Sequence, residues 1–267
     1  NRRRRRRGRE RENNRDTNEA WDGEPIPVAG HLELRSEGYG FLRVDGALPS
    51  KDDAYVPVKM VRQFGLRRGD HLTGASRPAN RNEKNPAMVE VATVNGGPPE
   101  AAVDRPDFDG LVSVFPNERI VLAGDQAPED PTARVIDLLT PIGKGQRALV
   151  AAPPRTGETT LLKHVIRALE HNHPELDLFV VLLDERPEDV TDMQEWVTKG
   201  EVAASAFDRP TEEQTTVAEM TMERAKRMVE DGRDVVVVLD GITRLARAYN
   251  MESPHGGRAV QGSVDRT

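Results

Sequence analysis

The chain has 267 residues, of which 36% are hydrophobic, 4% are aromatic and none is cysteine. This length allows one or two domains with sizeable cores, and the lack of cysteine excludes disulfides, thiolate zinc sites and a cysteine nucleophile. It also fits a reducing compartment, so we expect a cytoplasmic protein. No apolar run approaches the about 18 residues of a transmembrane helix, and no apolar segment follows the N-terminal arginines as in a signal peptide.

The net charge of -7 conceals an uneven distribution. Residues 1–15 contain nine arginines and two glutamates, net +7, whereas the rest of the chain has 29 basic and 43 acidic residues, net -14. Residues 1–27 contain almost no aliphatic side chains, which predicts a disordered Arg-rich tail. The run from Arg2 to Arg7 fits a phosphate-binding arm for nucleic acid, or equally a solvated tail.

Short apolar segments separated by turns fill residues 28–97. Five candidate strands recur at a spacing typical of a small all-β barrel, and helical spacing of apolar residues predicts a short helix after the third. The candidate strands are 29–35, 39–44, 54–58, 71–77 and 87–94. Residues 98–133 are rich in Pro, Gly and Asp, and we predict a connector containing a β-hairpin made of 111–115 and 119–124.

Continuous apolar runs appear in residues 134–267. They lie at 148–152, 178–184 and 235–240, and helical patterns at 159–172 and 215–232 stand between them. Such runs are typical of strands buried on both faces of a parallel sheet, so we predict an α/β domain.

The segment AAPPRTGETT, residues 151–160, has the pattern of a phosphate loop between a strand and a helix. In such a loop, backbone N–H groups and the helix N-terminus bind phosphates, and a hydroxyl such as that of Thr159 binds Mg²⁺. Ala152 replaces the first glycine of the motif, and Glu158 replaces its lysine. A carboxylate there would repel triphosphate oxygens by roughly several kcal/mol at low dielectric. Taken alone, the segment fits an ordinary turn before a helix equally well.

Acidic residues follow the other two predicted strands. Glu185 comes after 178–184, and Asp240 ends 235–240. Ligands of open α/β sheets bind beyond the carboxyl ends of the strands, where Glu185 could orient an attacking water and Asp240 could hold Mg²⁺. Asp240 alone could instead be a strand-end cap. The three strand ends together favour a nucleotide site.

These residues lie in strings that resemble the Rho family of bacterial transcription termination factors, which are hexameric ATP-dependent RNA helicases. The strings are GYGFLR, ALVAAPPRTGETTLL, LLDERPEDVTDM and AEMTMERAKRMVEDGRDVVVVLDGITRLARAYN, and the resemblance extends from about Gly30 to Asp265. The Arg-rich leader is similar to the tail of actinobacterial members. The resemblance implies an OB-fold or cold-shock-like RNA-binding domain at 28–97 and a RecA-like P-loop NTPase domain at 134–267. Members continue beyond this point, so we expect a C-terminally truncated, incomplete second domain.

The resemblance also implies site residues, cofactors and partners. ATP and Mg²⁺ would be the cofactors, with Thr159 and Asp240 as metal ligands. The partners would be pyrimidine-rich single-stranded RNA, the RNA polymerase elongation complex and copies of the chain in a homohexamer, with no membrane. The implied nucleotide-binding residues are Pro153, Pro154, Arg155, Thr156, Gly157, Glu158, Thr159 and Thr160; the catalytic ones are Glu185, Asp240, Arg186 and Arg244; the RNA-binding ones are Tyr39, Phe41, Arg43, Tyr55 and, in the pore loop, Arg258.

Bases would stack on Tyr39 and Phe41, since every base has a π-face. Both could instead be core residues, but alternation places them on one face beside Gly38 and Gly40, which would leave room for bases. Asn85 stands where the family often has another aromatic residue, so we expect a weaker platform.

The sequence is compatible with two functions. The first is a Rho-type ATP-dependent translocase or helicase that releases nascent RNA from RNA polymerase. The second is a catalytically impaired RNA-binding fragment, because Glu158 puts ATP hydrolysis in doubt. A third possibility, a rotary-ATPase-type subunit, is disfavoured by GYGFLR and DERPEDV.

Overall fold

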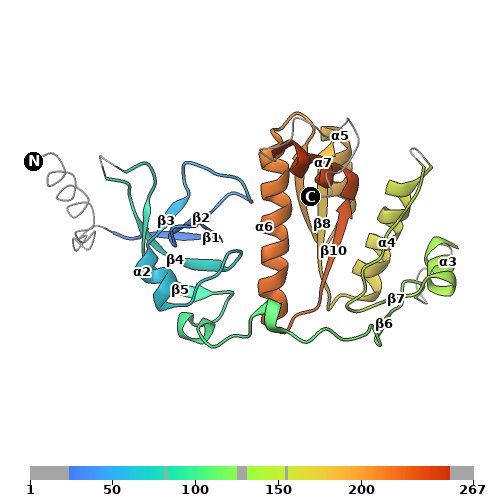
Figure 1. Cartoon of the computed structure of the whole chain (residues 1–267), viewed down its shortest axis with the longest axis horizontal. Coiled ribbons are helices and arrows are strands. Elements are labelled where there is room, and N and C mark those ends of the chain that lie inside the picture. The colour runs from blue at the N-terminus through green and yellow to red at the C-terminus, as the bar shows by residue number, and fades with distance from the viewer. Residues whose placement is uncertain (1–23, 81–82, 125–130, 154–155, 253–267) are drawn as a thin grey trace, which may run out of the picture.

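The computed structural model describes residues 24–80, 83–124, 131–153 and 156–252. The predicted tail up to residue 23, as well as Pro154, Arg155 and Arg258, therefore lie outside the described residues. An all-β barrel precedes an α/β domain with a parallel sheet, so the predicted fold class is confirmed (Figure 1). No helix within the described ranges is long and apolar enough to span a membrane.

The barrel closes in the strand order β1-β2-β3-β5-β4. Alternation along the strands sends Leu32, Leu42 and Leu72 into its centre, where all three are fully buried. Each of the five predicted strands forms, and so does the short helix. The elements are β1 (Ile26–Leu34), β2 (Gly40–Arg43), β3 (Ala54–Val56), α2 (Val58–Gln63), β4 (His71–Arg77) and β5 (Ala87–Val94).

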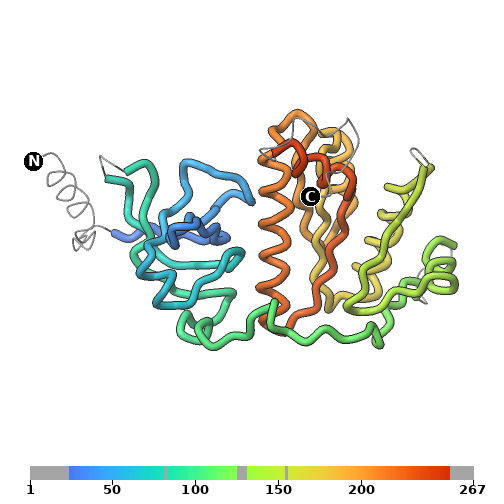
Figure 2. Tube along the Cα trace, in the orientation of Figure 1, coloured from blue at the N-terminus to red at the C-terminus, as the bar shows by residue number. Residues whose placement is uncertain are grey.

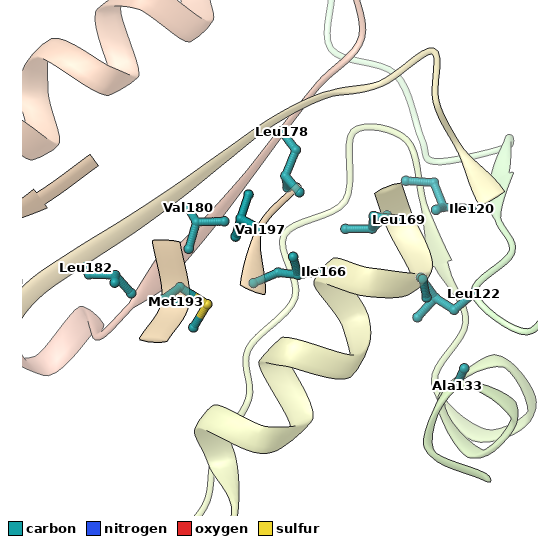
Figure 3. Packing of buried hydrophobic residues seen from close by; sticks show 11 residues of the cluster. Ile120, Leu122, Ala133, Ile166, Leu169, Leu178, Val180, Leu182, Met193 and Val197 are labelled. Carbon is teal, nitrogen blue, oxygen red and sulfur yellow. The ribbon is translucent and has the colours of Figure 1, made fainter. Parts of the chain in front are cut away.

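The α/β domain is built on a three-stranded parallel sheet in the order β10-β8-β9. Ile166 of α4 packs with Val180 and Leu182 of β8 on one face (Figure 3). On the other face α6 contacts all three strands and stands between the sheet and the barrel (Figure 1). The elements are α4 (Glu158–Asn172), β8 (Asp177–Glu185), α5 (Pro187–Trp196), β9 (Glu201–Ala206), α6 (Thr211–Glu230), β10 (Val235–Asp240) and α7 (Ile242–Glu252).

The predicted strand at 148–152 is wrong. In the structure this segment has no strand partner, and its apolar side chains are exposed, Leu149 by 75% and Val150 by 44%. Within the described ranges β10 pairs only with β8, so no strand links 148–152 to the sheet. An extended segment needs a neighbour for its N–H and C=O groups, and an apolar run cannot reveal whether that neighbour is present.

The connector does not contain the predicted hairpin. Residues 111–115 form no strand, and Phe115 is 92% exposed. Instead β6 (Arg119–Ile120) pairs with β7 (Ile142–Gly143), while the buried carboxylate of Asp137 accepts hydrogen bonds from the backbone of Leu122 and Ala123. Between the barrel and β6, the connector passes below α6 in the view of Figure 2. The remaining elements are two 3-10 turns, η1 (Pro99–Ala102) and η2 (Phe108–Gly110), and α3 (Pro131–Leu139).

A buried ion network, which we call the joint, links the barrel, the connector and α6. It contains two acids whose side chains are 0% exposed, Asp70 and Glu230. Arg105 donates to the Asp70 carboxylate at 2.6 Å, and Arg67 lies 2.9 Å from the Glu230 carboxylate. Glu230 also pairs with Arg227 at 3.0 Å and accepts the backbone N–H of Phe108 at 2.9 Å. Buried charges of this kind need charged partners, and the partners here come from both domains, so the joint requires both domains to be in place.

Candidate functional site

Three aromatic side chains gather on the outside of the barrel and form what we call the aromatic platform. They are Tyr39, Phe41 of β2 and Tyr55 of β3, with ring centroids 5.5 to 6.0 Å apart. Phe41 lies directly opposite Tyr55 in the β2–β3 ladder, so the pleat sends both to the same face. All three are only partly buried, which confirms that they are not simply core residues. The exposed parts of such rings can stack with planar groups.

Gly40, beside the platform, does not have the predicted role of leaving room for bases. A Cβ on Gly40 would lie 2.7 Å from Leu32 Cδ1 and 2.8 Å from the backbone oxygen of Glu33. Gly40 therefore allows β2 to approach β1 and does not open space for bases. Gly38 has a φ of +90°, which suits a glycine in the turn before β2.

Arg43 lies at the edge of the platform, with its guanidinium 5.6 Å from the centre of the Phe41 ring. It is buried, and it forms ion pairs with Glu33 and Asp53. Asp53 also accepts hydrogen bonds from the backbone N–H and the hydroxyl of Ser50, each at 2.8 Å. Asn85 donates to the backbone oxygen of Asp53 at 3.1 Å, so it supports this edge although it is not aromatic.

The phosphate-loop segment ends at Gly157, whose φ of +100° marks the turn into α4. Thr159 and Thr160 are exposed on the first helical turn, and Pro153 accepts a hydrogen bond from the Thr156 hydroxyl at 2.7 Å. The carboxylate of Glu158 turns back and accepts the backbone N–H of Thr156 at 3.3 Å. The backbone N–H of Thr156, which could bind a phosphate oxygen, thus already donates to the carboxylate of Glu158.

Asp240, at the carboxyl end of β10, lies in a strongly acidic setting. Burial raises its pKa, and the negative charges of Glu158 and Asp189 raise it further. Carboxylate and hydroxyl oxygens suit a hard cation such as Mg²⁺, so Asp240 and Thr159 fit a magnesium site chemically. A triphosphate fits the site less well, because Glu158 adds negative charge at the position where the motif has a lysine.

Glu185 ends β8, where an irregular register follows Leu183 and Asp184 has a positive φ of +57°. Arg244 of α7 forms an ion pair with the Glu185 carboxylate and donates to the backbone oxygen of Leu183 at 3.3 Å. Arg186 is exposed and occupies the N-cap position of α5 without a side-chain capping hydrogen bond. The structure thus brings Glu185 and Arg244 together, and places Asp240 near Glu158.

Two features of the site were missed by the sequence reasoning. Asp189 acts on Asp240 from α5, a helix that the apolar pattern did not predict. The pairing of Glu185 with Arg244 joins residues 59 positions apart in the chain. In the sequence, only the position of Glu185 at the end of a predicted strand indicated a functional residue, and this position does not reveal that Arg244 is its ion-pair partner.

These features define a protein that combines an OB-type barrel, with an aromatic cluster on its outer surface, and an α/β domain built on a parallel sheet. Family models agree: residues 28–100 match the Rho termination factor RNA-binding domain, and residues 132–261 match the nucleotide-binding domain of the ATP synthase alpha/beta family.

Individual relatives then identify the family. The chain is 53% identical over 245 residues to transcription termination factor Rho of Streptomyces lividans, 52% over 248 residues to that of Mycobacterium bovis, and 47% over 249 residues to that of Cereibacter sphaeroides. These alignments cover 91%, 90% and 92% of this chain, and 34%, 40% and 59% of the relatives. The chain belongs to the Rho family, and it spans about a third to three fifths of the length of these relatives.

Proposed function

We propose that the barrel binds single-stranded, pyrimidine-rich RNA and that the chain acts as a Rho-type transcription termination factor. The aromatic platform carries the proposal, because Tyr39, Phe41 and Tyr55 lie partly exposed within the region that matches the Rho RNA-binding model. Arg43, which is buried and ion-paired, would support RNA binding by holding the Phe41 ring. Arg258 in the C-terminal segment would add a contact to RNA, and the Arg-rich tail would bind phosphates without sequence preference.

The α/β domain would use ATP to move along that RNA. In this proposal Thr159 and Asp240 hold Mg²⁺, which neutralises charge on the phosphates, and Glu185 orients the attacking water. The loop at 153–160 would surround the phosphates, and Arg186 and Arg244 would contact them. The function would be termination of transcription, which the names of the relatives state. For this chain we further propose an RNA polymerase elongation complex as partner, a homohexamer as the working form and a cytoplasmic location.

A catalytically impaired RNA-binding fragment is the second candidate, and Glu158 is the observation that favours it. The match to the relatives continues through both domains, which favours the first candidate. Both candidates require RNA binding, so the barrel is tested first.

The RNA proposal is tested with fluorescence anisotropy of labelled oligo(C). A stacked base contributes about 1–3 kcal/mol, so Tyr39→Ala with Phe41→Ala should weaken binding by more than about tenfold. Phe115→Ala, which truncates an exposed aromatic outside the barrel, is the matched control and should bind like the parent. Deleting residues 1–15 should flatten the dependence of affinity on salt but keep the preference for cytidine. Equal affinity of the double variant and the parent would remove the platform from the proposal.

The catalytic proposal is tested by RNA-stimulated ATP hydrolysis. The first candidate requires turnover that RNA stimulates, whereas the second, favoured by Glu158, predicts essentially no turnover from the chain. In either case Glu158→Lys should bind nucleotide better, because the ammonium group can neutralise phosphate oxygens. Rapid hydrolysis by the parent would refute the role given to Glu158. Unchanged nucleotide affinity in Glu158→Lys would contradict the phosphate loop itself.

A further inference from the structure

A cavity of about 640 Å³ lies between the barrel and the α/β domain. His31 of β1 and His71 of β4 line its barrel side, and α6 with the first residues of β8 and β9 lines the other side. Glu185 and Asp240 stand at the carboxyl ends of strands of the same sheet, so the cavity lies at the opposite edge from the proposed nucleotide site. Its volume is in the range of small-molecule sites, about 300–1,000 Å³.

The two histidines form a pair on the wall of this cavity. They lie directly opposite each other in the β1–β4 ladder, and their ring centroids are 5.0 Å apart. Neither imidazole has a hydrogen bond with a residue in the described ranges. A neutral imidazole offers one donor and one acceptor nitrogen, and a protonated ring offers two donors. The pair can therefore present several N–H groups to one ligand.

Arg224 and Arg227 line the cavity on the side of α6. The guanidinium of Arg224 pairs with Glu201 and lies 5.1 Å from the centre of the Phe179 ring, and Arg227 pairs with Glu230 in the joint. In the part of the chain that the structure describes, the buried Nε of each arginine has no hydrogen-bond acceptor. A buried donor of a charged group without an acceptor is unfavourable, so both arginines retain a capacity to bind an anion.

The acids that line the cavity are largely neutralised by their neighbours. Three of them have partners, which are Arg224 for Glu201, Arg233 for Asp177, and the backbone N–H groups of Thr198, Lys199 and Gly200 for Glu170. Burial, together with Asp70 and Glu230, raises the pKa of the fourth, Asp231, so this acid loses its charge more easily than an ordinary aspartate. Lys199 and His173 add basic groups to the wall. An anion in the cavity thus meets little uncompensated negative charge.

The electrostatic potential at the histidine pair is positive. Burial lowers the pKa of His31 to about 3, with Arg224 and His71 acting in the same direction and Glu201 opposing them. Burial and Arg224 likewise lower the pKa of His71. Both rings are therefore uncharged at neutral pH. An anion beside them counteracts Arg224 and favours their protonated forms.

We propose that this cavity is a second ligand site, which binds a small dianion of the phosphate type between the histidine pair and the arginines of α6. The anion accepts N–H groups of His31 and His71 and lies next to the guanidinium of Arg224. A small ion fits better than a polymer, because the barrel touches α6 beside the cavity: a Cβ on Gly69 would lie 2.5 Å from the carbonyl carbon of Glu223. The anion favours protonated imidazoles, so its affinity rises as pH falls. The site depends on neither RNA nor nucleotide.

Sulfate titration of the full chain, followed by NMR of the ¹⁵N-labelled imidazoles, tests the site. Sulfate stays a dianion between about pH 5.5 and 7.5, so the pH dependence comes from the protein. Sulfate should shift the signals of His31 and His71, and leave His164, which follows the phosphate-loop segment on α4, unchanged. Its affinity should be at least about fivefold higher at pH 5.5 than at pH 7.5, because the bound state takes up protons. Chloride at equal ionic strength should not reproduce these shifts.

A double variant removes the proposed donors. His31→Gln with His71→Gln replaces both titrating rings with neutral amides, and binding is then followed at the backbone amides of Gly96 and Gly200, which line the cavity. The double variant should bind sulfate at least about fivefold more weakly than the parent at pH 5.5 and lose the pH dependence. His171→Gln, which removes an exposed imidazole of α4, is the matched control and should behave like the parent.

Four results would overturn the proposal. They are the absence of any sulfate-induced shift in the cavity, a shift of His164 without shifts of His31 and His71, an affinity that does not rise at low pH, and parent-like binding by the double variant. A final titration adds oligo(C) to the sulfate-bound chain. Sulfate that stays at the histidines supports a site for a small anion, whereas its displacement would assign the site to RNA phosphates.

Discussion

Removing Glu230 from the joint should destabilise the protein far more than removing a surface acid. The Glu230 side chain is 0% exposed and serves Arg67, Arg227 and the backbone N–H of Phe108. Breaking a buried ion pair by deleting one partner costs about 3–5 kcal/mol. Arg67 is 27% exposed and can regain water, whereas Arg227 is 7% exposed and cannot, so we expect about 3 kcal/mol for Glu230→Ala.

Urea unfolding, followed by circular dichroism and tryptophan fluorescence, measures this loss. Glu230→Gln keeps one acceptor oxygen and should lose about 2 kcal/mol, because the neutral amide still accepts a hydrogen bond. The matched control is Glu219→Ala, which breaks the more exposed pair of Glu219 with Arg68 at 2.8 Å and should cost less than about 1 kcal/mol. If Glu230→Ala costs no more than Glu219→Ala, the joint does not hold the domains together as argued.

Three other changes test the structure. Gly69→Ala should lower the free energy of unfolding in urea by about 1–3 kcal/mol more than Gly46→Ala does. Both glycines have positive φ, but only at Gly69 would a Cβ meet α6, 2.5 Å from the carbonyl carbon of Glu223. Equal losses would contradict this close approach. Burial, Arg224 and His71 lower the pKa of His31 to about 3, so His31 resists protonation in the native state. The free energy of unfolding should therefore fall as pH drops from about 6.5 toward 3. His31→Gln should flatten this fall when unfolding is measured across that range. Glu158→Gln should lower the pKa of Asp240, read from its carboxyl NMR shift, so that less stability is lost as pH rises above about 3.8; an unchanged shift would mean that Glu158 does not act on Asp240.

The barrel could be predicted from sequence because its information is local. Alternation of apolar and polar residues along each strand determines which side chains enter the core, and Leu32, Leu42 and Phe41 follow it. The same alternation placed Tyr39 beside Phe41 on the outer face. Gly40 was misjudged because the space that it saves lies toward β1, and a sequence does not show which neighbour a missing Cβ would meet.

The α/β domain was predicted less completely because its contacts are distant in sequence. The run 148–152 has the composition of a buried strand, but whether it pairs depends on a neighbouring strand. The short segment EVAASA has only one large apolar residue, Val202, yet it forms β9 because β8 offers it backbone partners along its length. The joint unites Asp70, Arg105 and Glu230, which nothing in local patterning could associate.

Glu158 acts on both halves of the nucleotide site at once. Its carboxylate accepts the backbone N–H of Thr156, so in the proposed site it would compete with a phosphate for the loop. Its charge also raises the pKa of Asp240, so it would weaken the proposed binding of Mg²⁺ by that residue at lower pH. Neither effect reaches the aromatic platform, which lies in the other domain. The effects of Glu158 are therefore separate from the RNA binding that we propose for the barrel.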